Sequence, residues 1–401
     1  MISQNDLKIK LYLSARDTKI LFTILLLTLS MVGCHDDTEE TLREQPPARR
    51  TLVMFMPWST NMKDYFEANV AGMEQAMADR ELADERVVVC IATTSTHAAI
   101  VELRRENGRS VRDTLQHISN PDFTTSSAIG RMLLDIKKYA PAKNYALVMG
   151  GHGMAWIPAV VWKKSAYSRV KHSARPLTRW IGGLDSMYQI DIPILADGIK
   201  SAGMTMDFIL FDDCYMSSVE VAYDLREVTH YVIACPTEIM AFGFPYQLCG
   251  RYLFCEPDFQ KLCSSFYDFY SAYEMPCGTV AVTDCTELDR LAAVVRSIHE
   301  VAGPIIDEEG EVQQMDGYSP PLFYDLEDTY LHACADSTLL ASLHDQLERT
   351  VVAKSCTNYY FSATSGALYK IRHFSGINTS EPSANSIVES KTTTAWYRAT
   401  H

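Results

Sequence analysis

Short apolar runs alternate along the chain with segments of helical periodicity, and this alternation constrains the fold more than any other feature. The runs with the length of buried strands are 51–58, 86–94, 144–153, 206–214, 230–236 and 278–284. The segments with helical spacing between them are 61–79, 126–140, 192–203, 217–228, 258–273 and 287–302. Buried strands that alternate with amphipathic helices are typical of a parallel sheet covered on both faces. The predicted fold class is therefore α/β, with a largely parallel sheet.

Two local patterns refine this prediction. Asn107-Gly108 lies between strand-like flanks in 100–116 and predicts a hairpin. Ser217 followed by Glu220 is the pattern of a capping box at the start of a helix. We expect residues 51–305 to form one α/β domain. Residues 306–401, which are first helical and then rich in short strands, are expected to form a mixed C-terminal elaboration packed on it.

The N-terminus has the organisation of a targeting segment. A basic stretch precedes the uncharged apolar run 20–33, which is shorter than the roughly 20 residues of a membrane-spanning helix. The run ends at Cys34 and resembles a bacterial lipoprotein signal, with residues 1–33 removed and Cys34 lipidated. An ordinary signal peptide, or an uncleaved anchor in which Cys34 is incidental, is the alternative.

The segment 34–50 is charged and contains Pro46-Pro47, so we expect a flexible tether between membrane and domain. Its acidic start, Asp36-Asp37, resembles the export signal of surface lipoproteins in Bacteroidetes-type bacteria. The expected location is the bacterial outer membrane, with the protein lipid-anchored and surface-exposed.

The net charge and the cysteine spacing argue against several classes of protein. The 401 residues carry a formal net charge of −14, which disfavours nucleic acid as a partner. The chain has no CxxC pair, so zinc-ribbon and thioredoxin readings lack support. Cys90, Cys235 and Cys285 lie in or beside apolar runs, where cysteine is expected to be a small buried hydrophobe.

Two strand ends carry reactive side chains. His152 lies in a glycine-rich turn directly after one apolar run, and Cys214 directly after another. Parallel strands end at the same edge of a sheet, so the two side chains can face each other across one cleft. A thiol with a base in reach, just before a predicted helix N-terminus, is the arrangement of a nucleophilic cysteine. Taken singly, each residue is more often structural.

The sequence also resembles the clostripain-like cysteine peptidases, part of a larger group that includes caspases, gingipains and legumains. The matching segments are GGHGMAW (150–156), FILFDDCYMSSVEVAYDLREVTHYVIACPTE (208–238), FGFPY (242–246), FYDLEDTY (323–330) and TTTAWY (392–397). The resemblance implies a caspase-like α/β fold and a cysteine endopeptidase acting on protein or peptide substrates. It implies no certain cofactor or metal, although some relatives bind calcium.

The resemblance also implies roles for individual residues. His152 falls on the catalytic histidine and Cys214 on the nucleophile, and the backbone amides of Gly153 and Cys214 on the oxyanion donors. Asp212 matches the acid that reads a basic side chain, which implies cleavage after Arg or Lys. Asp212 could instead cap a turn. Glu238 is the nearest candidate for a second pocket acid, and Trp156 could form a pocket wall or belong to the core.

The sequence departs from the family pattern at two places. Asp213 stands where a small residue is usual before the cysteine, and Met154-Ala155 stands where glycine-rich residues are common. These departures keep two alternatives open. One is a catalytically silent surface lipoprotein that binds peptides or glycans, and the other is a peptidase with non-basic specificity.

The segment 162–180 between the two motifs is basic, with no acid and no apolar periodicity. It is expected to be an exposed loop, and such loops are sites of nicking. Some clostripain-like enzymes are processed there after a basic residue, so Lys163, Lys164 and Arg169 are the expected self-processing points. A solvated loop without this role is the alternative.

Overall fold

The computed structural model describes residues 46–59, 61–78, 84–159, 182–183, 186–254, 256–307 and 310–401. The chain divides into the units Met1–Gln45 and Pro46–His401, and the second is described here. The predicted signal peptide with Cys34, and the processing candidates Lys163, Lys164 and Arg169, lie outside the described residues.

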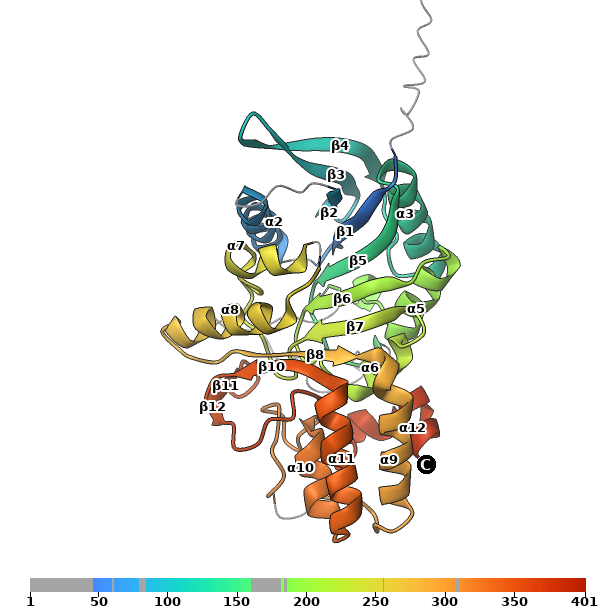
Figure 1. Cartoon of the computed structure of the whole chain (residues 1–401), viewed down its shortest axis with the longest axis vertical. Coiled ribbons are helices and arrows are strands. Elements are labelled where there is room, and N and C mark those ends of the chain that lie inside the picture. The colour runs from blue at the N-terminus through green and yellow to red at the C-terminus, as the bar shows by residue number, and fades with distance from the viewer. Residues whose placement is uncertain are drawn as a thin grey trace, which may run out of the picture. The chain divides into compact units, whose positions relative to one another are not determined.

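A nine-stranded sheet runs through the second unit in the order β10-β8-β7-β6-β5-β1-β2-β3-β4 (Figure 1). The strands are β1 Ala48–Met56, β2 Glu85–Thr94, β3 His97–Glu106, β4 Arg109–Ser119, β5 Ala142–Gly150, β6 Met206–Asp212, β7 Thr229–Ala234, β8 Thr279–Asp284 and β10 Val351–Cys356. The five strands from β7 to β2 are mutually parallel, and the strands at both edges are antiparallel. The predicted largely parallel α/β fold is confirmed.

Helices cover both faces of the sheet, as Figure 1 shows. One face carries α2 Lys63–Ala78, α7 Tyr246–Cys249 and α8 Phe259–Ala272. The other carries α3 Ser126–Tyr139, α5 Ile192–Ser201 and α6 Val219–Leu225. The central strands are apolar along nearly their whole length because both of their faces are buried, as in β1, where Val53 to Met56 have no exposed surface.

The predicted hairpin is confirmed at β3 and β4. Asn107 and Gly108 have φ angles of 51° and 78°, which is the left-handed backbone that a two-residue hairpin turn requires. At the opposite edge, β8 follows α8 but pairs antiparallel with β7. The apolar sequence of β8 indicates a buried strand. It does not indicate whether that strand runs parallel or antiparallel to its neighbour.

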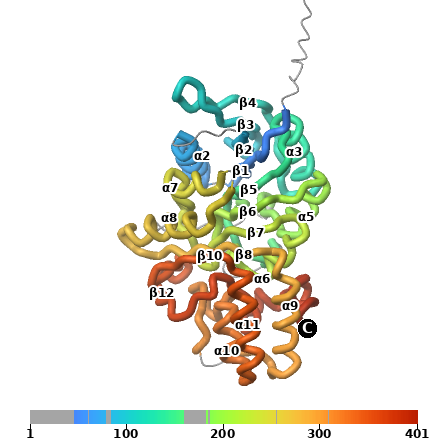
Figure 2. Tube along the Cα trace, in the orientation of Figure 1, coloured from blue at the N-terminus to red at the C-terminus, as the bar shows by residue number. Residues whose placement is uncertain are grey.

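The C-terminal residues complete the sheet and add a further layer. Strand β10 lies within 306–401 and pairs with β8 at the edge. The remaining elements are α9 Leu288–His299, β9 Tyr324–Asp325, α10 Leu326–Ala333, α11 Ser337–Thr350, β11 Tyr359–Ser362, β12 Ala367–Lys370, β13 Asn378–Thr379 and α12 Ala395–Thr400. Short 3-10 segments are η2 Ser186–Tyr188, η3 Gly250–Leu253, η4 Cys285–Glu287 and η5 Ser386–Thr393. Helix α12 packs against α9, so the C-terminus lies beside α9 (Figure 2).

Two local expectations differ from the structure. Strand β1 begins at Ala48, so the last three residues of the expected tether 34–50 belong to the sheet. The predicted capping box is wrong, because α6 begins at Val219 with Ser218 as its N-cap residue. The hydroxyl of Ser217 instead donates to the carbonyl of Gly376, which is 159 residues away in sequence.

Candidate active site

Strand register brings the two predicted reactive residues to one edge of the sheet. Gly150, the last residue of β5, pairs with Asp212, the last residue of β6. His152 and Cys214 each follow two residues after this pair. The parallel direction of β5 and β6 therefore places the imidazole loop and the thiol loop side by side, as the sequence predicts.

Asn61 holds the imidazole of His152. It lies just beyond the carboxyl end of β1, the neighbour of β5, and its Oδ1 is 2.8 Å from Nε2 of His152. An amide oxygen can only accept, so Nε2 carries the hydrogen and Nδ1 is the basic nitrogen. The backbone N–H of His152 donates to Gly182 at 3.2 Å, which fixes the loop from a second side.

The thiol of Cys214 lies against the backbone of Ile239, beyond the end of β7. The N–H of Ile239 donates to Sγ at 3.4 Å, and Sγ lies 3.7 Å from the Ile239 carbonyl oxygen. Cys214 has no exposed surface and His152 is only 2% exposed. The reactive pair is therefore enclosed in this conformation.

The backbone turns sharply immediately after the nucleophile. Tyr215 has a φ of 62°, which is the left-handed region and is unfavourable for a side chain of this size. Its N–H donates to Thr237, its hydroxyl donates to Glu238 at 2.6 Å, and its ring stacks on Phe323 at a centroid distance of 4.9 Å. These contacts offset the backbone strain and fix where Cys214 lies.

Gly153 allows the histidine loop to approach the cysteine. A Cβ atom at this position would lie 2.5 Å from the carbonyl oxygen of Cys214 and 3.1 Å from its nitrogen. No side chain fits there without displacing the Cys214 backbone. The two residues predicted to supply oxyanion donors are thus in direct backbone contact.

Asp212 lies beneath the FGFPY segment. Its Oδ1 accepts from the N–H of Phe244 at 2.9 Å and its Oδ2 from the hydroxyl of Tyr246 at 3.0 Å. The carboxylate is fully buried. These two donors belong to the FGFPY segment 242–246, one of the segments that resemble the family.

The other two predicted pocket residues, Glu238 and Trp156, contact the C-terminal part of the chain. Glu238 accepts from Tyr215, from the hydroxyl of Ser362 at 2.7 Å and from the N–H of Ala363 at 2.9 Å. Trp156 is buried in the core, and its Nε1 donates to Ser380 at 3.1 Å. In this conformation both side chains join the C-terminal residues to the strand ends.

The described cysteines other than Cys214 form no disulfides, and all of them except Cys356 are buried. Burial raises the pKa of Cys90 and Cys263 to about 12, and burial with the nearby Glu238 raises that of Cys277 to about 12. These three thiols are protonated at neutral pH and cannot act as nucleophiles.

Asn61 is the functional residue that the sequence patterns missed. It follows the strand 51–58, and a polar residue after an apolar strand was the available signal. The signal was weak because residues 59–62 contain several polar side chains, and only the adjacency of β1 and β5 selects Asn61.

A thiol and an imidazole at adjacent ends of parallel strands, with a glycine backbone packed against the thiol residue, define a cysteine hydrolase of caspase-like fold. The comparisons identify the family. The model described as the clostripain family matches residues 54–397, and the chain belongs to that family of cysteine peptidases.

Solved structures agree with this assignment. A secreted C11 cysteine protease from Bacteroides thetaiotaomicron, "iotapain", is 44% identical, with a TM-score of 0.83, covering 89% of this chain and 100% of the other. A clostripain from Bacteroides thetaiotaomicron ATCC 29148, in complex with the peptide inhibitor BTN-VLTK-AOMK, is 48% identical, with a TM-score of 0.54, covering 55% and 99%.

A third structure shares the fold. The inactive zymogen of a C11 protease from Parabacteroides distasonis is 24% identical, with a TM-score of 0.76, covering 89% of this chain and 99% of the other. No curated protein matches the chain.

Proposed function

We propose that this protein is a cysteine endopeptidase that hydrolyses peptide bonds after Arg or Lys with the dyad Cys214 and His152. The observation that carries the proposal is the register of β5 and β6, which brings both residues to one sheet edge, with Asn61 on the imidazole. Each step of hydrolysis has a group suited to it at this edge.

In the first step His152 takes the thiol proton at Nδ1, because Nε2–H is held by Asn61. The thiolate attacks the scissile carbonyl carbon, and the oxyanion accepts from the backbone N–H groups of Gly153 and Cys214. The imidazolium then protonates the leaving amine as the C–N bond breaks. A water activated by His152 hydrolyses the thioester and regenerates the thiol.

Asp212 would supply the basic specificity. A buried carboxylate two residues before the nucleophile is a strong partner for a lysine or arginine cation, provided that residues 244–246 open to admit it. The inhibitor bound to the related clostripain, BTN-VLTK-AOMK, contains the peptide VLTK, which ends in lysine, and this supports the same preference here. Glu238 would act from beyond β7 as a second acid.

The enclosure of the dyad favours an activation step. Cys214 has no exposed surface, so a peptide reaches it only after a covering segment moves. Self-cleavage after Lys163, Lys164 or Arg169 would cut the chain between the His152 motif and the Cys214 motif. Purified wild type should develop a new N-terminus after one of these residues, and Cys214→Ala should not. An uncut wild type with full activity would rule out the step.

Export and lipid anchoring complete the proposal. No described helix is long and apolar enough to cross a bilayer. The related "iotapain" is described as secreted. The N-terminal signal that ends at Cys34 supports export with a lipid on that cysteine, and the acidic residues after it support a surface position on the outer membrane.

Cleavage of a peptide library tests the specificity. Lysine and arginine substrates should be preferred, and Asp212→Asn should lower kcat/KM for them far more than for neutral substrates. An amide keeps the bond from Phe244, so the fold should persist. Asp207→Asn, near the start of β6 and away from the strand end, is the matched control. An unchanged preference in Asp212→Asn would remove Asp212 from the pocket.

A further inference from the structure

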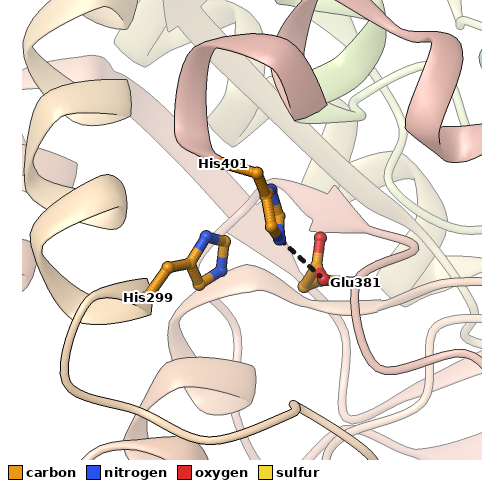
Figure 3. A group of neighbouring side chains, drawn as sticks. All are labelled: His299, Glu381 and His401. Carbon is orange, nitrogen blue, oxygen red and sulfur yellow. Dashed lines mark ion pairs between the residues drawn. The ribbon is translucent and has the colours of Figure 1, made fainter.

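Three side chains from distant parts of the chain converge beside α9, far in sequence from the dyad residues. They are His299, the last residue of α9, Glu381, which follows β13, and His401, which follows α12. One nitrogen of each imidazole and one oxygen of the carboxylate all lie within 4.8 Å of one another. Figure 3 shows both rings and the carboxylate directed toward one shared space.

Backbone carbonyls orient both rings in the same way. Nδ1 of His299 lies 3.0 Å from the carbonyl oxygen of Thr400. Nδ1 of His401 lies 3.3 Å from the carbonyl oxygen of Tyr397 and 3.1 Å from the hydroxyl oxygen of Thr400, which can also accept. A carbonyl oxygen only accepts, so each Nδ1 carries the hydrogen and each Nε2 keeps a lone pair. This second contact, an Nδ1–H held by a carbonyl, is the usual support of a metal-binding histidine.

The charges also suit a cation. Glu381 is largely buried and contributes a negative charge, 3.6 Å from Nε2 of His401. The positive charge of Lys391 disfavours a cation here, because its Nζ lies 3.6 Å from the same carboxylate oxygen. Nζ also donates to the backbone carbonyl oxygens of Ser380 and Glu381, so these bonds hold it independently of the carboxylate.

We propose that His299, Glu381 and His401 form a zinc site that fastens the C-terminal helix to α9. Two imidazoles and one carboxylate are a ligand set that Zn²⁺ accepts, with water as the fourth ligand beside the exposed His401. Nε2 of His401 and the Glu381 oxygen lie 3.6 Å apart. If each were about 2.1 Å from the same ion, the ligand–ion–ligand angle would be about 120°, which is near the tetrahedral value. Nitrogen donors disfavour Ca²⁺ and Mg²⁺.

Binding would require a small closure. Ligand atoms of a tetrahedral zinc ion lie about 3.4 Å apart, whereas the present ligand atoms lie within 4.8 Å of one another, so the outermost pair must approach by up to about 1.4 Å. Nε2 of His299 now lies 3.2 Å from the hydroxyl of Tyr330, which the cation would replace. Such a site would join α9, α12 and the segment that follows β13. The same segment contains Ser380, which accepts a hydrogen bond from Trp156.

Zinc titration of untagged full-length protein tests the proposal. The Cys214→Ala background is used so that the thiol and His152 cannot add a second zinc site. We expect one Zn²⁺ per chain and a raised melting temperature, with no comparable effect of Mg²⁺ or Ca²⁺. His401→Ala and Glu381→Gln should each weaken zinc binding by about tenfold or more.

Two further variants sharpen the test. Lys391→Met removes the opposing charge and should tighten zinc binding. His344→Ala, an exposed histidine paired with Glu327, is the matched control and should bind zinc as the background does. His401 is exposed, so its variant should fold as the background does. Equal zinc affinity in His401→Ala and His344→Ala, or no saturable zinc binding, would overturn the proposal.

Discussion

The imidazole of His152 is oriented by Asn61, whose Oδ1 lies 2.8 Å from Nε2. This bond selects the tautomer in which Nδ1 is basic, so Asn61 is a positioning residue. Its loss leaves the substrate contacts of the cleft in place but lets the ring rotate and change tautomer.

Asn61→Ala should therefore lower kcat by about tenfold or more while KM stays near the wild-type value. Steady-state kinetics on a lysine peptide measures both quantities, and the pH profile of kcat should shift because the imidazole loses its partner. Asn144→Ala, an exposed asparagine at the start of β5, is the control. A kcat equal to that of the control would show that Asn61 does not position His152.

Tyr215 contributes through its hydroxyl as well as its ring. Burial and the neighbouring Glu238 raise the pKa of Tyr215 well above its usual range, so the hydroxyl remains a donor to Glu238. Tyr215→Phe removes one of the three donors of that buried carboxylate.

The Tyr215→Phe variant should lose about 1–3 kcal/mol of unfolding free energy, the range for a hydrogen bond to a buried charged group. Urea denaturation measures the loss. Tyr267→Phe, which lies on α8 with 41% exposure, is the control and should change little. A wild-type midpoint in Tyr215→Phe would mean that the hydroxyl does not hold the turn.

At the scale of elements, the segment 373–380 contacts both the start of α10 and the loop after β6. Asp325 caps α10 and also accepts from the N–H and hydroxyl of Ser375 and from Nδ1 of His373 at 3.0 Å. The bond to Asp325 raises the pKa of His373 against the lowering effect of burial, and the nearby carboxylates Glu327 and Asp328 add to the rise.

A raised folded-state pKa gives stability that is complete below the unfolded value of about 6.5 and lost as the pH rises through the folded value. His373→Gln should thus cost on the order of 1 kcal/mol at acidic pH, and the cost should shrink at alkaline pH. Chemical denaturation across pH measures it, with exposed His117→Gln of β4 as the control. A cost that grows with pH would contradict this account.

Elements that depend on local sequence were predictable, and those that depend on distant partners were not. The hairpin at Asn107-Gly108 follows from two residues that tolerate a left-handed backbone. The capping box at Ser217 failed because the carbonyl of Gly376 provides a buried partner for its hydroxyl. Cys214 and His152 could be paired from strand ends alone, whereas Asn61 required the knowledge that β1 adjoins β5.

At the scale of the whole molecule, the proposed N-terminal signal would determine where the enzyme acts. Cys34 ends the apolar run, and lipidation there would hold the peptidase at a membrane through the tether. Cys34→Ala should abolish incorporation of a fatty-acid analogue and move the protein out of the membrane fraction. Labelling and fractionation measure this, with Cys356→Ala as the control, and equal labelling of Cys34→Ala and wild type would refute the anchor.

Cys214 is the proposed nucleophile of a peptidase that accepts lysine before the scissile bond. A peptide acyloxymethyl ketone ending in lysine, of the kind bound by the related clostripain, should attach to the active chain. Peptide mapping by mass spectrometry should find one adduct per chain, on Cys214. Cys214→Ala should lose both the adduct and peptide hydrolysis. An adduct on another cysteine, or hydrolysis at the wild-type rate in Cys214→Ala, would contradict the account.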